Sequence, residues 1–257
     1  MKEFSNRYIF IFSAVMVIAV ATLLSLAATL LQPRQLKNLE IEKKKSMLES
    51  IGIPSTHETT ESLYVKYIKD SFVLNSKGEI VDGADAFTVV LNIEQKKPLE
   101  QQYLPVFNAT PDDGEKVIIL PVEGKGLWGP IFGYISLKSD MNTIYGVTFD
   151  HKGETPGLGA EINTTPFESM FNGKKLFETE KFVSIGVIKG GVKSADPHNV
   201  DAISRGTISS KGIEYFLEYV NKDNILFGLL RLRIVNNQAI IRELHVYGQA
   251  LRIGIKA

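Results

Sequence analysis

The longest apolar stretch of the chain lies near its start. From Tyr8 to Leu31 the sequence contains no charged residue. At about 1.5 Å per residue in a helix, this stretch is long enough to cross the hydrocarbon core of a bilayer, which is about 30 Å thick. A cleaved signal peptide is the alternative, but its apolar region is typically shorter. The pattern therefore predicts one uncleaved transmembrane helix, with residues 1–32 as tail and anchor and residues 33–257 as a second region.

Basic residues flank the apolar stretch unequally. Two precede it, Lys2 and Arg7, and five follow closely: Arg34, Lys37, Lys43, Lys44 and Lys45. By the positive-inside rule this count would place the second region in the cytoplasm, but long domains are translocated largely regardless of such charges. The run of three lysines fits the solvated face of a helix, with contact to anionic lipid as the alternative.

Beyond the apolar stretch, helical and strand-like patterns alternate. Residues 34–51 carry apolar side chains on one helical stripe, and Gly52 marks the end of that helix. A second amphipathic helix follows Thr207, with Ile213, Phe216, Leu217 and Val220 at helical spacing. Short apolar runs between turn residues predict strands at residues 87–93, 116–122, 132–137, 143–149 and 182–188. The second region is therefore predicted to be α+β.

Two further local patterns each predict a structural element. Thr165-Pro166-Phe167-Glu168 has the form of a capping box with proline at the first helical position, and so predicts a short helix. Asn236-Asn237 stands between two arms rich in apolar residues, from Leu230 to Leu244, which predicts a hairpin of unknown role.

Composition excludes several classes of function. There are 29 basic and 29 acidic residues, so no excess positive charge indicates a nucleic-acid partner. The chain has no cysteine, which excludes disulfides, iron–sulfur ligation and a cysteine nucleophile. Its four histidines are scattered without the spacing of metal ligands.

A glycine-rich segment, Gly124 to Gly129, fits the letters of the dinucleotide-binding pattern G-x-G-x-x-G. Pro130 and a strand-like run follow it, so it lacks the helix whose N-terminus would hold a pyrophosphate. We interpret it as a turn leading into a strand. Trp128, the one tryptophan, is expected in the core rather than against a cofactor.

Two polar loops carry the candidate chemistry. In HKGETPGLGAE, from His151 to Glu161, the glycines permit close approach to a planar ligand, although an ordinary loop would also explain them. In DAISRGTISS, from Asp201 to Ser210, hydroxyl side chains precede the amphipathic helix. A helix N-terminus of this kind suits a phosphate group, and a simple serine-rich cap is the alternative.

The same loops carry a family resemblance. DAISRGTISS resembles the S-G-A-T-x-[ST]-[ST] attachment motif of FMN-binding domains, with Arg205 and Gly206 where that motif has glycine and alanine. ETPGLG, from Glu154 to Gly159, resembles the loop that lies against the flavin in those domains. With the N-terminal anchor and the segment GKGLWGPIFGYISL, residues 6–220 resemble the C subunit family of sodium-translocating NADH:quinone reductases more than the G subunit of the Rnf complex.

The resemblance implies specific roles for residues. In that family a threonine esterifies the FMN phosphate, and the corresponding residue here is Thr207. A separate flavin transferase would use FAD and magnesium to attach FMN, releasing AMP. The implied cofactor-binding residues are, around the phosphate, Ser204, Gly206, Ile208 and Ser209, and, along the ring, Glu154, Thr155, Leu158 and Gly159. None of these residues would be catalytic and none would bind a metal.

The resemblance also implies a function and a location. The chain would be an electron-carrying subunit with an FMN-binding domain at about residues 115–220, relaying electrons from NADH towards ubiquinone while sodium is exported. Its partners would be the other subunits of the reductase, the flavin transferase and membrane lipid. It would sit in a bacterial inner membrane with its second region in the periplasm. The alternatives are the G subunit of the Rnf complex and a flavin-free module that assembles a membrane complex.

Overall fold

The structure, a computed structural model, describes residues 5–76, 78–179, 181–193, 195–204, 206–217, 227–235 and 238–246. The chain divides into two compact units, Met1–Lys43 and Lys44–Ala257. The longer elements in chain order are α1 (Asn6–Ser50), α2 (Thr60–Tyr67), β1 (Ile68–Leu74), α3 (Leu91–Glu94), β2 (Leu104–Ala109), β3 (Val117–Lys125), β4 (Pro130–Lys138), β5 (Ile144–His151), α4 (Thr165–Glu168), β8 (Gly186–Ile188), β9 (Asn199–Asp201), α5 (Thr207–Leu217), β10 (Phe227–Val235) and β11 (Gln238–Val246). The remaining elements are the strands β6 (Phe177–Glu178) and β7 (Lys181–Phe182) and the 3-10 turns η1 (Ala86–Thr88), η2 (Leu99–Gln101), η3 (Gly159–Asn163) and η4 (Ser169–Phe171).

α1 contains the apolar stretch that the sequence assigns to the membrane. Within the described residues it is the one helix long and apolar enough to cross a bilayer. Its large apolar side chains are exposed, including Phe10, Ile18 and Leu30. The helix continues without a break through Pro33 to Ser50, so the predicted helix at residues 34–51 is the continuation of the apolar segment.

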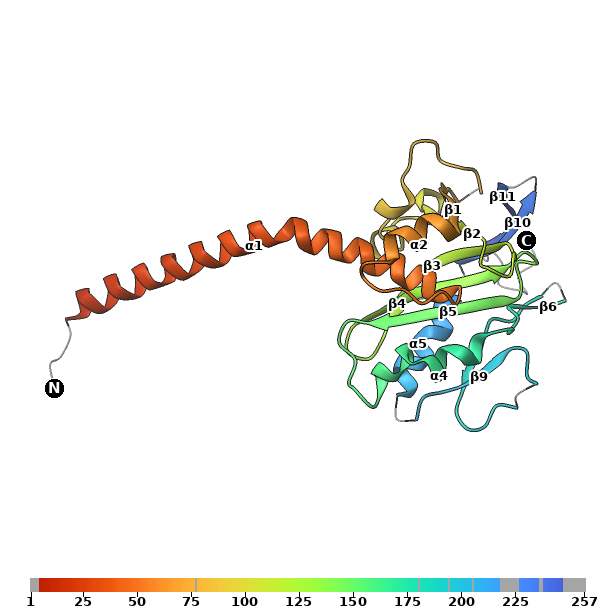
Figure 1. Cartoon of the computed structure of the whole chain (residues 1–257). Helices are drawn as coiled ribbons and strands as arrows, with labels where there is room; N and C mark the ends of the chain where they lie inside the picture. The colour runs from red at the N-terminus through yellow and green to blue at the C-terminus, as the bar shows by residue number, and fades with distance from the viewer. Residues whose placement is uncertain are drawn as a thin grey trace, which may run out of the picture. The chain divides into compact units, whose positions relative to one another are not determined.

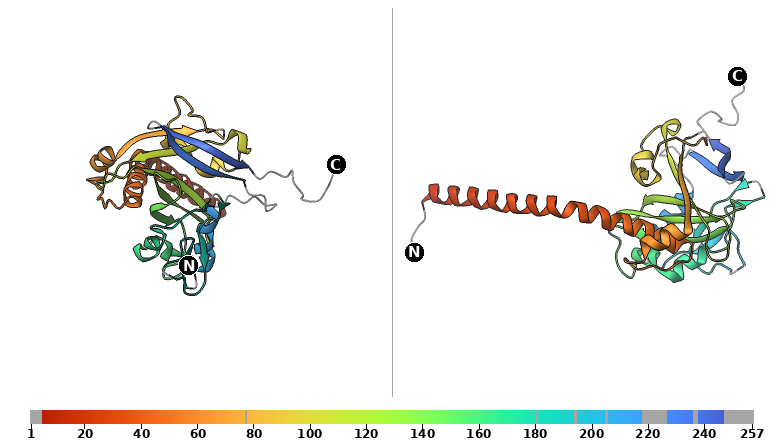
Figure 2. Two further views of the ribbon diagram at one scale, coloured as in Figure 1. Left: turned by 90° about the vertical axis from the view of Figure 1, so that its right-hand side faces the viewer. Right: turned by 45° about the horizontal axis from the view of Figure 1, so that its top comes forward.

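An antiparallel sheet of five strands, in the order β1-β2-β3-β4-β5, organises the second unit (Figure 1). Consecutive strands are neighbours throughout, as is usual for elements that follow each other in the chain. Short connections join β2 to β5, whereas η1, α3 and η2 lie between β1 and β2. β3 and β4 pair over their whole length, from Val117 opposite Lys138 to Lys125 opposite Pro130. Beyond β5 the chain forms α4, α5 and the short parallel pair β8 and β9, which gather on one side of the sheet in Figure 2.

Alternating side chains of β4 build a separate core on each face of the sheet. Ile131, Ile135 and Leu137 belong to one buried cluster, which also contains Phe171 from η4 and Ile213 from α5. On the opposite face, Tyr134 of β4 belongs to a cluster with Met47, Leu48 and Ile51 from the end of α1 and Tyr67 from α2. The period-two pattern of a strand with both faces covered explains why β4 has few polar residues.

The last turn of α1 packs closely on the sheet within the second unit. The hydroxyls of Ser50 and Ser136 lie 2.7 Å apart, and both side chains are fully buried. A Cβ at Gly146 would lie 2.4 Å from the Ser50 carbonyl oxygen, so a side chain there would push the helix away. Gly52, with φ +75°, then ends the helix in the left-handed conformation that glycine adopts readily.

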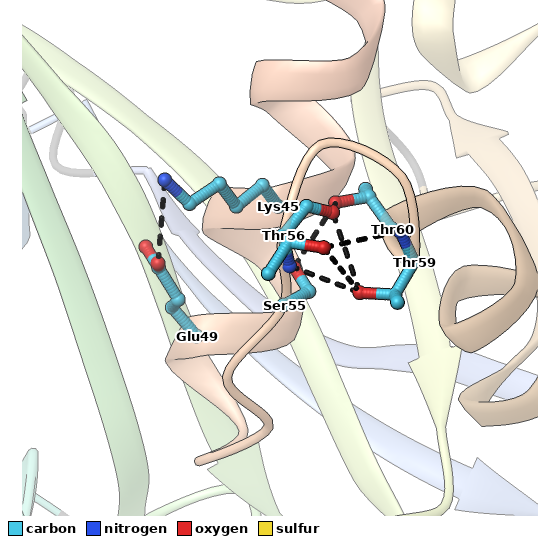
Figure 3. A network of polar contacts seen from close by, with 6 residues as sticks. All are labelled: Lys45, Glu49, Ser55, Thr56, Thr59 and Thr60. Carbon is cyan, nitrogen blue, oxygen red and sulfur yellow. Dashed lines mark hydrogen bonds and ion pairs between the residues drawn. The ribbon is translucent and has the colours of Figure 1, made fainter.

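A turn of hydroxyl side chains starts α2, which the sequence analysis did not predict. The Thr56 backbone N–H donates to Thr59 Oγ1 at 2.9 Å, and Thr60 Oγ1 donates to the Thr56 carbonyl at 2.7 Å (Figure 3). Threonine side chains bond readily to nearby backbone groups in this way, which stabilises the turn before a helix. α2 is only eight residues long and lacks a strong apolar period, so its residues carry little signal of a helix.

The predicted α+β class with an N-terminal apolar helix is confirmed, but two predicted strands are wrong. Residues 87–93 form η1 and α3 instead, because Asp85 accepts a hydrogen bond from the Phe87 backbone N–H and favours a turn. Residues 182–188 are divided between β7 and β8 at Ser184, whose φ of +61° interrupts a strand. β1 and β2 were not predicted from the sequence.

The hairpin predicted around Asn236-Asn237 has its arms in β10 and β11, which pair antiparallel. Asn236 and Asn237 themselves lie outside the described residues.

Glu168 does not form the predicted capping box. The residue preceding α4 is Thr164, no side chain caps this helix, and Glu168 Oε1 instead accepts the backbone N–H of Phe149 in β5 at 2.7 Å. Burial raises the pKa of Glu168 to about 7. The nearby charges of Glu49 and Asp150 raise this pKa further, and the hydrogen bond from Phe149 lowers it in part. The carboxyl group therefore favours its neutral form more strongly in the folded chain than in the unfolded chain.

We expect Glu168→Gln to stabilise the domain at pH 8. A raised pKa in the folded state gives stability that is present in full below the unfolded value of about 4.5 and is lost as the pH rises through about 7. The amide stays neutral and can still accept from Phe149. Since the side chain is partly exposed, we expect a gain of about 1–2 kcal/mol, or about 3–6 °C in Tm. Thermal unfolding at pH 5 and pH 8 measures it, and an equal Tm of both chains at pH 8 would contradict it. The exposed Glu178→Gln is the matched control.

Candidate functional site

A pocket of about 260 Å³ opens where three segments of the second unit meet. The turn between β3 and β4, the loop after β5 and the start of α5 each contribute to it. Its lining residues are Leu127, Trp128, Glu154, Thr155, Leu158, Gly159, Gly206, Ile208 and Ser209. The two loops that carry candidate chemistry in the sequence therefore line one cavity.

The carboxylate of Glu154 joins the three segments. Its Oε1 accepts the backbone N–H of Trp128 at 2.9 Å, and its Oε2 accepts the hydroxyl of Ser209 at 2.5 Å. Glu154 is 5% exposed and Ser209 is 1% exposed. Burial alone would raise the pKa of Glu154, but the Ser209 hydroxyl and the backbone N–H groups of residues 127–129 outweigh burial and hold this pKa below its usual value.

The loop after β5 is held in shape by its own backbone. The carbonyl of Thr155 accepts the N–H of Leu158 at 3.1 Å and that of Ala160 at 3.2 Å. Gly157 has φ +74°, a conformation that other residues rarely adopt, and its N–H donates to Glu161 Oε1 at 3.0 Å. This turn brings Leu158 and Gly159 to the pocket wall.

Two glycines without side chains let the chain at α5 pack closely, Gly206 against the loop after β5 and Gly212 against β3. A Cβ at Gly206 would lie 2.7 Å from the Leu158 carbonyl oxygen, and one at Gly212 would lie 2.6 Å from that of Lys125. Ile213, the next residue of α5, is fully buried and anchors the helix in the core. The first backbone N–H groups of a helix have no partner within it. The start of α5 thus presents N–H groups that are not bonded within the helix, and the positive end of its dipole, beside the pocket.

The structure brings together most residues that the sequence selected. Seven of them line the pocket: Glu154, Thr155, Leu158, Gly159, Gly206, Ile208 and Ser209. Ser204 is exposed in the turn before α5 and is not among the lining residues. Thr207 is the first residue of α5, between two lining residues, and its side chain lies outside the described part of the structure. Arg205 also lies outside it.

The expectation that Trp128 belongs to the core is wrong. Its side chain is 70% exposed and it lines the pocket together with Leu127, which is 50% exposed. Both residues occupy the tight turn between β3 and β4, closed by the Gly126 N–H donating to the Gly129 carbonyl at 2.8 Å. Two large apolar residues at a hairpin turn have no core to enter. Large apolar residues at a predicted turn are therefore the sequence feature that could have identified Leu127 and Trp128 as part of a binding site.

The pocket has the chemistry expected of a flavin phosphate site. Leu127, Trp128, Leu158 and Ile208 offer apolar surface to a flat ring, and the start of α5 offers N–H donors to a phosphate. Gly159 and Gly206 line the pocket and let the neighbouring segments approach their backbone closely. The residues present therefore fit FMN.

Gly159→Ala is expected to destabilise the domain, whereas Gly153→Ala in the same loop is its matched control. A Cβ at Gly159 would lie 2.3 Å from Glu154 Oε2 and 2.4 Å from Ser209 Oγ, so these two side chains must shift and their buried hydrogen bond is strained. A Cβ at Gly153 would meet nothing within 4 Å. We expect a loss of about 2–3 kcal/mol for Gly159→Ala and less than about 0.5 kcal/mol for Gly153→Ala, measured by chemical denaturation. Equal losses in the two variants would contradict this description of the site.

The fold and the pocket together define an FMN-binding domain that follows an N-terminal apolar helix in the chain. Residues 126–221 match the family described as FMN-binding domain. Among relatives, the C subunit of the Na(+)-translocating NADH-quinone reductase of Vibrio vulnificus (strain YJ016) is 31% identical over an alignment of 213 residues that covers 77% of this chain and 83% of the relative. The corresponding C subunit of Haemophilus ducreyi is 32% identical over an alignment of 209 residues that covers 75% of this chain and 80% of the relative.

A solved structure supports the same assignment. The crystal structure of the C subunit of the Na(+)-translocating NADH-quinone reductase from Parabacteroides distasonis ATCC 8503 superposes with a TM-score of 0.66 at 42% identity, covering 73% of this chain and 91% of that one. The chain belongs to the C subunit family of Na(+)-translocating NADH-quinone reductases. This confirms the resemblance seen in the sequence and places the chain, with its helix long and apolar enough to cross a membrane, among the subunits of an oxidoreductase complex.

Proposed function

We propose that this chain holds FMN covalently, through the FMN phosphate, on the hydroxyl of Thr207. The observation that carries the proposal is the common pocket of the two motifs: the ETPGLG loop and the residues on both sides of Thr207 line one cavity. Neither motif alone distinguishes a cofactor site from an ordinary loop or cap. Their meeting at the start of an 11-residue helix supports a ligand with a ring at one end and a phosphate at the other.

Each group of residues would hold a different part of the cofactor. Ser204, Gly206, Ile208 and Ser209 would surround the phosphate, which the dipole and the free N–H groups of α5 attract. Glu154, Thr155, Leu158 and Gly159 would lie along the ring, and Leu127 and Trp128 join this second group. Their work is to bind and orient, since the redox chemistry belongs to the flavin itself.

Attachment would be a transfer reaction performed by a separate flavin transferase with magnesium. The Thr207 oxygen forms a new ester bond with the FMN phosphorus of FAD, the bond between the two phosphates of FAD breaks, and AMP leaves with the displaced oxygen. The hydroxyl proton is taken up by the transferase or by water. Oxidation states do not change in this step. Thr207 then serves as an attachment point and has no turnover of its own.

The bound FMN would make the chain an electron carrier within the reductase. The relatives are named as subunits of a Na(+)-translocating NADH-quinone reductase. By that relationship, this chain would accept electrons that originate from NADH, pass them towards quinone and support sodium export together with the other subunits. A covalent bond suits this role because the carrier cannot lose its flavin between transfers.

The apolar part of α1 would anchor the chain in the lipid of a bacterial inner membrane, with residues after Leu31 in the periplasm. The exposed apolar side chains of α1 support the anchor. The number of lysines after the apolar stretch argues for the opposite orientation, but the second unit is long enough for translocation to proceed regardless of them.

Flavin fluorescence of the denatured chain tests the proposal. The chain should be produced in a host that contains the matching flavin transferase and run on a denaturing gel. An ester bond survives denaturation, whereas noncovalent FMN is lost, so we expect a fluorescent band at the position of the chain. A dark band would favour the alternative of a flavin-free assembly module.

A further inference from the structure

The glycine-rich segment Gly124 to Gly129 lies against the side chain of Glu154. We propose that Glu154 is a positioning residue that holds the β3–β4 turn, with Leu127 and Trp128, and the first turn of α5 in place, so that the pocket exists before any cofactor enters it. This role concerns how the chain builds its own pocket. It goes beyond the proposed attachment of FMN to Thr207.

The contacts of the carboxylate support the proposal. One oxygen accepts the N–H of Trp128 in the turn, and the other accepts the hydroxyl of Ser209 in α5, at 2.9 Å and 2.5 Å. Glu154 itself belongs to the loop after β5, so a single side chain connects all three walls of the pocket. Since the group is 5% exposed, water cannot readily replace either partner.

The surrounding glycines show that the space is shaped around this carboxylate. A Cβ at Gly126 would lie 2.4 Å from Glu154 Oε1, and a Cβ at Gly159 would lie 2.3 Å from Glu154 Oε2. Each oxygen therefore faces a position where only glycine leaves room for it. A glycine is therefore required at position 126 to leave space for the carboxylate of Glu154, and no dinucleotide is needed to account for it.

The same contacts limit what Glu154 can do chemically. Hydrogen-bond donors occupy both oxygens and favour the ionised form. Glu154 thus acts as a fixed acceptor that orients the pocket walls, and any proton that reaches a bound ligand comes from another group.

The fluorescence of Trp128 gives a direct test, because it is the one tryptophan of the chain and sits in the turn that Glu154 holds. The full-length chain should be purified in detergent from a host without the flavin transferase, so that no flavin quenches the signal. We expect Glu154→Ala to lower the Trp128 anisotropy and to lower Tm by roughly 5–10 °C, because the buried Ser209 hydroxyl and the Trp128 N–H lose their acceptor. Glu154→Gln should restore most of both values, since its amide oxygen can accept from Trp128 and its NH₂ can donate to the Ser209 oxygen.

A double-mutant cycle provides the matched control. Ser209→Ala should add little to the loss in Glu154→Ala, because both changes remove the same bond. Ser210 is equally buried, but its hydroxyl donates to the Gly206 carbonyl at 2.9 Å, so Ser210→Ala should add its full effect. If Glu154→Ala does not fold, Ser209→Ala and Glu154→Gln carry the test through Tm and anisotropy alone.

The proposal is overturned if the loss of Glu154 leaves the Trp128 anisotropy unchanged, or if Glu154 and Ser209 behave as independently as Glu154 and Ser210. It is equally overturned if Glu154→Gln recovers nothing relative to Glu154→Ala. None of these measurements involves a flavin. The positioning role of Glu154 can therefore fail while attachment to Thr207 stands, or hold while attachment fails.

Discussion

Thr207→Ala is expected to remove all flavin fluorescence from the denatured chain. Alanine has no hydroxyl, so no ester with the FMN phosphate can form, whatever the affinity of the pocket for free FMN. Thr207→Ser keeps a hydroxyl on the first residue of α5 and should retain part of the signal. In-gel fluorescence, normalised to the amount of chain in each band, measures both variants against the wild type.

The control for this prediction is a hydroxyl deletion outside the pocket. Ser169→Ala removes an exposed hydroxyl in η4 that donates to the Pro166 carbonyl of α4, and it should leave the fluorescence unchanged. A fluorescent band from Thr207→Ala would show that another residue carries the flavin. Loss of the band in Ser169→Ala as well would indicate a general effect on expression or folding.

Cysteine labelling is expected to place the second unit in the periplasm. The chain has no cysteine of its own, so a single introduced cysteine reports on one position. Glu178 is an exposed residue of β6 in the second unit, and Ser5 precedes the apolar stretch, so Glu178→Cys and Ser5→Cys report on the two regions. Because the apolar part of α1 is long enough to span the membrane once, the two positions should lie on opposite sides of it.

A membrane-impermeant maleimide added to intact spheroplasts should therefore label Glu178→Cys almost completely and Ser5→Cys hardly at all. After permeabilisation with detergent, both variants should react. The opposite pattern would reverse the proposed orientation and would agree with the count of lysines after the span. Equal labelling of both in intact spheroplasts would contradict a transmembrane α1.

Sequence periodicity predicted the parts of the fold that depend on local patterns. β3, β4 and β5 were found because their apolar runs are long and lie between clear turn residues, and the amphipathic pattern after Thr207 located α5. β1 was missed because its residues Lys69, Asp70 and Ser71 are exposed and interrupt the apolar pattern. Its place in the sheet depends on pairing with β2, which one strand alone does not encode.

The candidate site could be predicted only in part. The two motifs identified seven lining residues, but Trp128 was expected in the core and turned out to be exposed on the pocket wall. What decides its position is the tight turn at Gly126 and the hydrogen bond from its backbone to Glu154. Such a contact between segments far apart in the chain depends on the completed fold. For the same reason, the sequence alone does not predict that Gly126 and Gly159 leave space for the carboxylate of Glu154.

The intact mass of the purified wild-type chain is the most direct test of covalent FMN on Thr207. After production with the flavin transferase, the chain should be heavier than its sequence by one FMN less one water, and treatment with a phosphodiesterase should remove the riboflavin portion of that increment. Fragmentation of the peptide that contains residues 206–210 should place the remaining phosphate on Thr207. A mass equal to that of the sequence alone, or an increment on a different residue, would contradict attachment at Thr207.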